Sequence, residues 1–145
     1  MSIWRSLKTV EHLNGMNHAS LNGHLEIKFV EIGEDFISGT MPVDARTMQP
    51  YGLLHGGASV ALAETLGSTG AAMCVDDREY QVVGQEINAN HVRAARSGLV
   101  TGTARPLHLG GRTHVWGIEI VNEAKKLVCV SRITMAVIKR GSLSS

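Results

Sequence analysis

The sequence predicts an α+β fold in which an antiparallel sheet wraps around one long helix. Residues 57–75 are rich in Ala and Leu and have the length of a helix. Segments before and after them alternate apolar and polar residues, as half-buried strands do. Turn residues join several of these segments at hairpin spacing. A single long helix can bury its apolar sides only against such a sheet, so the two elements are expected to form two layers.

The first third of the chain is predicted to contain a helix and a hairpin. Apolar residues recur at helical spacing over 2–16, with Trp4 as an aromatic anchor. Alternation over 25–32 predicts a strand with Leu25, Ile27 and Phe29 turned inward. A second strand over 36–41 follows a short turn, so the two strands are expected to pair as a hairpin.

Four further strands are predicted after the helix. Their ranges are 81–92, 99–108, 113–121 and 127–138. In the strand over 113–121, Trp116, Ile118 and Ile120 occupy alternate positions and are expected to share one face. The last, 127–138, is apolar at both parities, which predicts burial on both faces. Residues 139–145 are expected to be a polar tail.

Length and composition bound the class of protein. The 145 residues predict a single domain over 1–145, with 43% apolar and 19% charged residues. A net charge of +1 predicts no bulk attraction to nucleic acid or to an anionic membrane. The longest uncharged apolar run, 58–63, is too short to span a bilayer. Cys74 and Cys129 form no disulfide framework, and no signal-like segment follows Met1, so we expect a cytoplasmic protein.

Glu64 is the first candidate functional residue. It is the only Asp, Glu, Lys or Arg between residues 47 and 75. A lone carboxylate in an apolar helix is costly unless it is paired or solvated at a site. Glu64, Gly67, Ser68 and Ala71 lie at i, i+3, i+4 and i+7, on a stripe of small side chains that a ligand or a second backbone can approach.

The loop before the helix carries the second set of candidates. Residues 49–57 contain turn-forming residues and end in two glycines. The first N–H groups of a helix and the positive end of its dipole suit an oxyanion, so the Gly56 and Gly57 amides are candidate donors to a polarised carbonyl. Gln49 and His55 are the neighbouring polar side chains.

The second half of the chain is basic. No Asp or Glu occurs over 87–118, whereas Arg93, Arg96, Arg105 and Arg112 all do. Arginine recognises phosphate well, which predicts a phosphate-binding surface. A solvated basic edge of the sheet is the structural alternative.

These motifs together resemble the hotdog-fold acyl-CoA thioesterases, and the resemblance covers residues 25–138. It is strongest to the bacterial branch that hydrolyses aryl-CoA thioesters, which includes the 1,4-dihydroxy-2-naphthoyl-CoA hydrolases of menaquinone synthesis. The signatures are Gln49-Pro50-x-Gly52-x-x-His55-Gly56-Gly57, Glu64 after a short apolar run, Ile87-Asn88-x-Asn90-His91, and Leu107-His108-Leu109-Gly110.

The resemblance implies a hydrolase whose active sites lie between subunits. Dimers would join their sheets edge to edge and pair into tetramers. Coenzyme A would be part of the substrate, with no separate cofactor and no metal. Glu64 would be the general base or the nucleophile. Gln49 and Gly56 would lie at the thioester carbonyl, His55 would orient the substrate or assist the leaving thiolate, and Ser68 would hold the attacking water.

The resemblance also implies the residues that contact coenzyme A. They fall in two segments, together with a glycine that would admit the pantetheine arm. The positions are Gly84, His91, Val92, Arg93, Ala94, His108, Leu109, Gly110, Gly111, Arg112 and Thr113.

Other functions stay open at this point. Hotdog folds also include dehydratases and hydratases, which place their acid and histidine differently. A thioesterase for aliphatic or carrier-protein-bound acyl groups is a further alternative, as is a non-catalytic acyl-CoA-binding module, although Glu64 argues against the last. The seven histidines show no HxxxH-like spacing with a third ligand nearby, so no metal site is expected.

Overall fold

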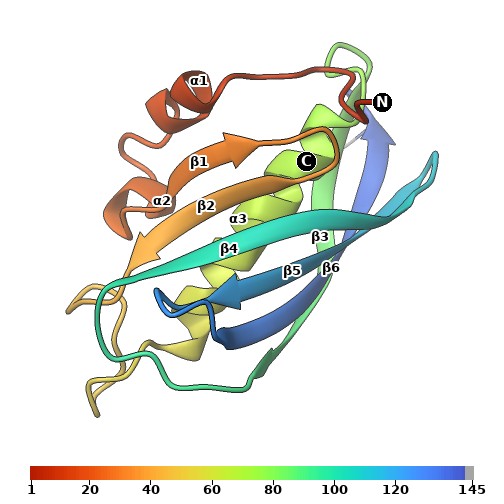
Figure 1. Ribbon diagram of the computed structural model, residues 1–145. Helices are drawn as coiled ribbons and strands as arrows, with labels where there is room; N and C mark the ends of the chain where they lie inside the picture. The colour runs from red at the N-terminus through yellow and green to blue at the C-terminus, as the bar shows by residue number, and fades with distance from the viewer. Residues whose placement is uncertain (143–145) are drawn as a thin grey trace.

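The computed structural model describes residues 1–142 and confirms the α+β class. One long helix, α3, lies against a single curved sheet (Figure 1). The elements in chain order are α1 (Val10–Gly15), α2 (Leu21–His24), β1 (Lys28–Ile32), β2 (Ile37–Pro42), α3 (Gly56–Met73), β3 (Tyr80–His91), β4 (Leu99–Leu109), β5 (Thr113–Val121) and β6 (Leu127–Lys139).

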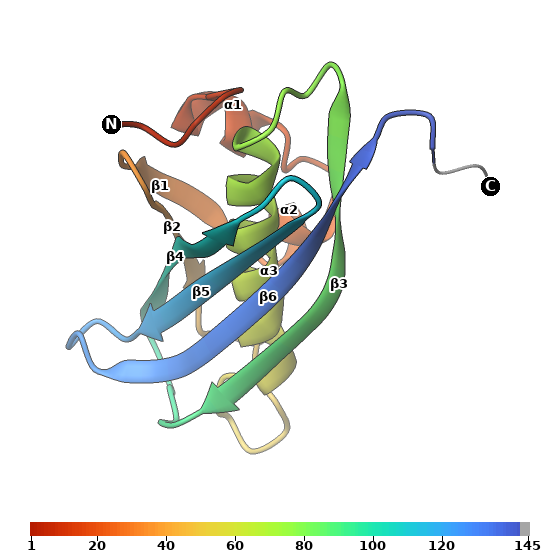
Figure 2. The same cartoon turned by 90° about the vertical axis from the view of Figure 1, so that its right-hand side faces the viewer.

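The sheet has six strands in the order β1-β2-β4-β5-β6-β3. Every neighbouring pair is antiparallel, and β1 and β2 form the predicted hairpin. Figure 2 shows the sheet curving around α3. Because β3 follows α3 but pairs only with β6, this twelve-residue strand forms one edge of the sheet, and β1 forms the other. A long edge strand leaves a row of backbone groups open to a further strand.

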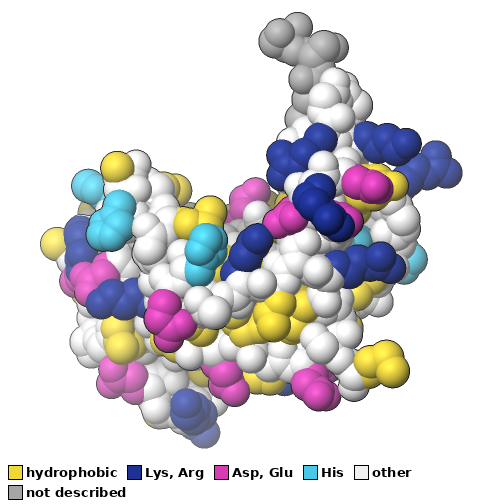
Figure 3. Space-filling view, turned by 90° about the horizontal axis from the view of Figure 1, so that it is seen from above, with side chains coloured by type: hydrophobic (Ala, Val, Ile, Leu, Met, Phe, Trp, Pro, Cys, Tyr) yellow, Lys and Arg dark blue, Asp and Glu magenta, His cyan; other side chains and the backbone are white. Residues whose placement is uncertain are grey.

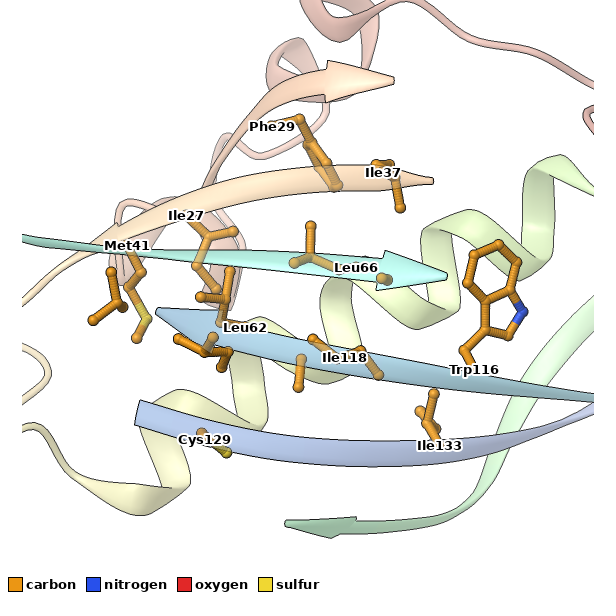
Figure 4. Close-up of a cluster of buried hydrophobic side chains, with 14 of the residues drawn as sticks. Ile27, Phe29, Ile37, Met41, Leu62, Leu66, Trp116, Ile118, Cys129 and Ile133 are labelled. Atoms are coloured by element: carbon orange, nitrogen blue, oxygen red, sulfur yellow. The ribbon is translucent and has the colours of Figure 1, made fainter. Parts of the chain in front are cut away.

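The core lies between α3 and the inner face of the sheet (Figure 4). Leu62 and Leu66 are fully buried against it, and the predicted inward residues of β5 are buried as well. A Cβ atom on Gly67 would lie 2.6 Å from Ile133 Cγ2, so only glycine lets α3 come this close to β6. Part of the stripe of small residues is therefore a packing surface of the chain itself.

The predicted helix over 2–16 is wrong for most of its length, because only Val10–Gly15 is helical. The backbone N–H groups of Arg5 and Ser6 donate to the Met73 carbonyl at 2.8 and 3.0 Å. The last carbonyls of a helix need such donors, and residues 5 and 6 provide them only when the segment is not helical. Trp4 is an anchor, as predicted: its ring stacks on Trp116 at 6.2 Å.

Other boundaries differ by a few residues. The first strand starts at Lys28 rather than at residue 25, although Leu25, Ile27 and Phe29 are all buried as predicted. Within the single chain, β6 is not buried on both faces as predicted, because the side chains of its outer face are half-buried or exposed, apart from Val128. Lys139 belongs to β6, so the tail starts one residue later. The part of the predicted tail over 143–145 lies outside the described residues.

Among residues 1–142, no helix has both the length and the apolar character needed to cross a membrane.

Candidate active site

Glu64 lies on the side of α3 that faces the β3 edge of the sheet. Its side chain is exposed, and within residues 1–142 it makes no ion pair. A Cβ atom on Gly84 of β3 would lie 3.0 Å from Glu64 Oε1. The absence of a side chain at Gly84 therefore leaves room for this carboxylate. The lone carboxylate is solvated rather than buried, which is one of the two ways in which its desolvation cost can be avoided.

Only part of the small-residue stripe around Glu64 is accessible. Gly67 and Ala71 are buried beneath the sheet, contrary to the prediction that the whole stripe is open to a ligand. Ser68, one turn beyond Glu64, is half-buried. Glu64 and Ser68 are thus the two polar groups of the stripe that a substrate can reach.

The start of α3 is capped by His55. Its Nδ1 atom accepts a hydrogen bond from the Gly57 N–H at 2.8 Å. This bond requires a lone pair on Nδ1, so neutral His55 carries its proton on Nε2 and presents a donor there. Among the described residues, the Gly56 N–H has no acceptor. The structure therefore leaves Gly56, and not Gly57, as the free amide of the predicted pair.

His91 lies over this helix start. A Cβ atom on Gly56 would be only 2.8 Å from His91 Nε2, so the imidazole can lie this close to the backbone because residue 56 has no side chain. The predicted coenzyme A contact at His91 and the predicted carbonyl site at Gly56 are therefore adjacent within one chain.

Gln49 is held in a tight turn. Its side-chain Oε1 accepts a hydrogen bond from the Tyr51 N–H, and its backbone N–H donates to the Leu53 carbonyl at 2.8 Å. Gly52 closes the turn with a φ of 78°, which favours glycine. With Oε1 already engaged, the side-chain amide of Gln49 presents its N–H groups as donors.

The helix start and Glu64 are too far apart to act together within one chain. Gly56 and Glu64 are eight residues apart on α3. At 1.5 Å per residue this separates them by about 12 Å along the helix axis. A general base and an oxyanion donor must each lie about 3 Å from the groups of a single thioester. One chain alone therefore does not assemble the predicted catalytic set.

The two predicted coenzyme A segments are also far apart. His91 pairs with Cys129, and Thr113 pairs with Ala136, seven residues further along β6. At about 3.3 Å per residue, the segments lie roughly 23 Å apart along the sheet. Residues 91–94 leave the sheet at the end near the start of α3, whereas residues 108–113 turn at the opposite end.

The predicted phosphate-binding arginines divide into two groups. Arg105 is occupied: it pairs with Asp35 at 2.7 Å and lies 4.5 Å from the centre of the Phe36 ring. Arg93, Arg96 and Arg112 are exposed and have no carboxylate partner within residues 1–142. Figure 3 shows Lys and Arg side chains gathered on the side of the molecule where β6 ends.

His114 is a buried polar residue to which the sequence alone assigns no role. It is 4% exposed, and its Nδ1 atom has no hydrogen-bond partner among the described residues. It lines a cleft of about 620 Å³ together with Cys74 and Tyr80. Burial lowers the pKa of His114, the nearby His108 lowers it further, and a hydrogen bond to the Gly110 backbone opposes both. His114 and Trp116 are two residues apart on β5 and therefore share its inward face, which is the sequence signal that His114 is buried.

Within residues 1–142, no group of three or more His, Cys, Asp or Glu side chains is arranged to hold a metal ion.

Comparison with known proteins identifies the family. Residues 51–129 match the model of the thioesterase superfamily. The chain is 54% identical to the 1,4-dihydroxy-2-naphthoyl-CoA hydrolase of Escherichia coli, covering 94% of this chain and 99% of that protein. It is 47% identical to the proofreading thioesterase EntH of Cronobacter turicensis, covering 93% and 98%. The crystal structure of a thioesterase from Haemophilus influenzae superposes with a TM-score of 0.94 at 49% identity, covering 99% of each chain.

The family match and the structural match agree with the observed fold and confirm the resemblance. The family model includes α3 with Glu64, as well as β3, β4 and β5. The chain therefore belongs to the thioesterase superfamily, as a hotdog-fold thioester hydrolase acting on acyl-CoA thioesters.

Proposed function

We propose that this chain hydrolyses an aromatic acyl-CoA thioester, of the 1,4-dihydroxy-2-naphthoyl-CoA type used in menaquinone synthesis, in a site shared by two subunits. The observation that carries the proposal is the unpaired carboxylate of Glu64 beside Gly84, on the free edge of β3. The name of the E. coli relative supports the aromatic acyl group. Two free, buried cysteines fit a reducing compartment, so we assign the reaction to the cytoplasm.

The chemistry follows from the groups that are free to act. Glu64 takes a proton from a water positioned by Ser68, or attacks the carbonyl carbon itself. The Gly56 N–H and the Gln49 side-chain amide stabilise the negative charge that develops on the carbonyl oxygen. The carbon–sulfur bond then breaks, and the Nε2–H of His55 donates a hydrogen bond to the leaving thiolate. Where Glu64 is the nucleophile, water then hydrolyses the acyl–Glu64 anhydride, so both routes give the free acid and coenzyme A.

A dimer through β3 would bring these groups together. Val92 directs its N–H to the Val128 carbonyl of β6, and backbone direction alternates along a strand. The N–H groups of Ile87, Ala89 and His91 therefore point to the open edge, where an antiparallel copy of β3 can bind them. We infer that two copies pair in this way.

The two-fold axis of this pair passes beside Ile87 or Asn88. Hydrogen-bonded and non-hydrogen-bonded pairs alternate in an antiparallel ladder, so a symmetric pair must place some residue opposite its own copy. Residues 87 and 88 lie midway between Gly84, which borders Glu64, and His91, which covers Gly56. An axis at Ile87 places the partner subunit's His91 opposite Val83, and an axis at Asn88 places it opposite Gln85, so in both cases it lies one residue from Gly84.

The same axis brings together the two sets of groups that lie far apart in the single chain, namely the helix start with Glu64 and the two predicted coenzyme A segments. The partner subunit's Gly56 lies beside the partner subunit's His91, and Glu64 lies beside Gly84. The pairing therefore brings the partner subunit's Gly56 to the level of Glu64. The partner subunit's residues 91–94 come to the level of Ala136 and Thr113, since Val83 pairs with Ala136 and Ala136 with Thr113. Each catalytic set, and each set of coenzyme A contacts, then draws on both subunits. Pairing of two such dimers into a tetramer is part of the same proposal.

A second candidate is a thioesterase that removes wrongly loaded acyl groups from a carrier protein. The identity to a proofreading thioesterase favours it. The exposed, unpaired Arg93 and Arg112 favour coenzyme A, because its nucleotide phosphates suit arginine and a carrier protein lacks that nucleotide.

Release of free thiol tests the proposal directly. The wild-type chain is assayed on aryl-, short-chain and long-chain acyl-CoAs and on acyl-pantetheines, with Glu64→Gln as the blank. We expect the highest kcat/KM on an aryl-CoA. Preference for a saturated acyl chain would contradict the aromatic assignment, and equal rates on acyl-CoA and acyl-pantetheine would favour the carrier-protein alternative.

Arg93→Ala is expected to raise KM for acyl-CoA about tenfold or more, because one charge-assisted contact to phosphate is lost. KM for the matching acyl-pantetheine, which has no nucleotide, should stay within about twofold. Steady-state kinetics on the two substrates measure both values. Arg105→Ala is the matched control, since its guanidinium already binds Asp35. An equal rise in KM on both substrates would remove the phosphate role of Arg93.

Cysteine cross-linking tests the position of the axis. Ile87→Cys or Asn88→Cys should give a disulfide-linked dimer on mild oxidation, because residues opposite each other in a ladder have Cβ atoms about 5 Å apart. Non-reducing electrophoresis detects the product. Val30→Cys, exposed on β1 at the other edge of the sheet, should stay monomeric on the gel. Failure of both β3 variants to cross-link, or equal cross-linking at residue 30, would disprove this pairing.

A further inference from the structure

One aromatic side chain of this protein is free, and it lies in the loop of the active site. The chain has two Phe, two Trp and two Tyr. Five of these six are engaged or at least half-buried, as follows: Trp4 and Trp116 stack on each other, Phe29 is buried, Phe36 lies under Arg105, and Tyr80 lines the cleft beside His114. Tyr51 is 87% exposed.

The backbone that carries Tyr51 is rigidly held. The Tyr51 N–H donates to the Gln49 side chain, and the Gly52 N–H donates to the Gln49 carbonyl at 3.0 Å. A bridge between Met48 and Leu54 closes the base of the loop. An ordered turn that presents a solvated aromatic ring is typical of a binding contact, because little conformational entropy is lost when the ring is covered.

We propose that Tyr51 forms one wall of the acyl pocket and selects aromatic acyl groups. The inference rests on the shared site proposed above. Helices related by the two-fold axis run in opposite directions. The chain that precedes the partner subunit's Gly56 therefore continues past Glu64, toward the C-terminal end of this chain's α3.

Small side chains form the opposite wall. Ser68 and Ala72 follow Glu64 at i+4 and i+8, and Ala72 is exposed in the single chain. The partner subunit's Tyr51 faces this part of α3 across the pocket. The result is a flat slot between a phenol ring and small side chains. A planar acyl group fills such a slot and gains offset stacking on the ring, whereas a saturated group of the same size cannot stack.

Two substrates that differ only in ring saturation test this role. Benzoyl-CoA and cyclohexanecarbonyl-CoA are compared by kcat/KM, or by Ki against benzoyl-CoA where turnover is too slow. Tyr51→Ala is expected to lower kcat/KM for benzoyl-CoA about tenfold, the upper range for loss of one aromatic pair. The same substitution should lower kcat/KM for cyclohexanecarbonyl-CoA less than about threefold. Tyr51→Phe keeps the ring and should stay within about twofold of wild type on both.

The outcomes separate this role from the reaction itself. Equal losses on both analogues in Tyr51→Ala, or a loss in Tyr51→Phe as large as in Tyr51→Ala, would overturn the stacking role. Failure of the wild type to hydrolyse benzoyl-CoA or any other aryl-CoA would instead overturn the proposed function. Leu7→Ala, an exposed apolar residue outside the site, is the matched control and should change neither substrate. Size-exclusion chromatography of each variant checks that the subunits still associate.

Discussion

Glu64→Gln is expected to lower kcat for thioester hydrolysis by about 10²- to 10⁴-fold, the usual contribution of a positioned general base. At 1.36 kcal/mol per factor of ten, this is a loss of about 3–5 kcal/mol of transition-state stabilisation. Glutamine matches the size of glutamate, so the packing beside Gly84 is kept. Binding of coenzyme A should change little, because the nucleotide contacts lie elsewhere.

The measurement combines thiol release with calorimetric titration of coenzyme A. Glu31→Gln is the control, since this carboxylate is exposed on β1, at the edge of the sheet away from Gly84. Its activity should match that of the wild type. Near-normal turnover of Glu64→Gln would end the catalytic hypothesis. A large loss of coenzyme A affinity in this variant would show that the substitution disturbs binding rather than chemistry.

Mixing two inactive variants is expected to restore activity if the site is shared. Gln49→Ala should lower kcat by about 10²-fold, through loss of a donor to the carbonyl oxygen. In a dimer that combines this variant with Glu64→Gln, one site carries both substitutions and the other carries neither. Random assortment of the two chains then regenerates wild-type geometry in about one quarter of all sites. The mixture should recover roughly that fraction of wild-type kcat, far above either variant alone.

Co-expression of the two variants with different affinity tags isolates the mixed dimer, in which one site of the two is intact, so this purified species should show about half of wild-type kcat. Each variant co-expressed with a differently tagged copy of itself is the control and should stay inactive. If Gln49 and Glu64 acted within one chain, the mixed dimer would be as inactive as each variant alone. This result would contradict the shared site without bearing on whether Glu64 is catalytic.

Local patterns predicted most of the elements of the fold. Alternation over β5 identified Trp116, Ile118 and Ile120 as inward residues, because strand geometry turns every second side chain to the same face. The helix around Glu64 was predicted to within two residues at each end, because its composition and length leave no other regular structure. The predicted N-terminal helix was wrong because its residues 5 and 6 instead donate their N–H groups to the Met73 carbonyl. Such a contact between distant segments leaves no trace in the local periodicity.

The candidate site shows the same division. A lone carboxylate, a glycine pair at a helix start and unpaired arginines can be read along the chain, since each is a property of residue type and short spacing. Whether these residues come together in space cannot be read along the chain. The fold separates Gly56 from Glu64 by about 12 Å along one helix, since eight residues rise by that distance. It also directs Glu64 and His91 to the same open strand edge.

The sequence by itself therefore determined the fold class and the family, and it supplied the candidate groups of the proposed site. Only the tertiary structure decided that Arg105 is occupied, that Gly57 is already hydrogen-bonded, and that the groups of one chain do not converge. The physical reason is distance. Hydrogen bonds and proton transfers act over about 3 Å, whereas sequence spacing leaves the separation of residues on different strands undefined until those strands pair in a particular register.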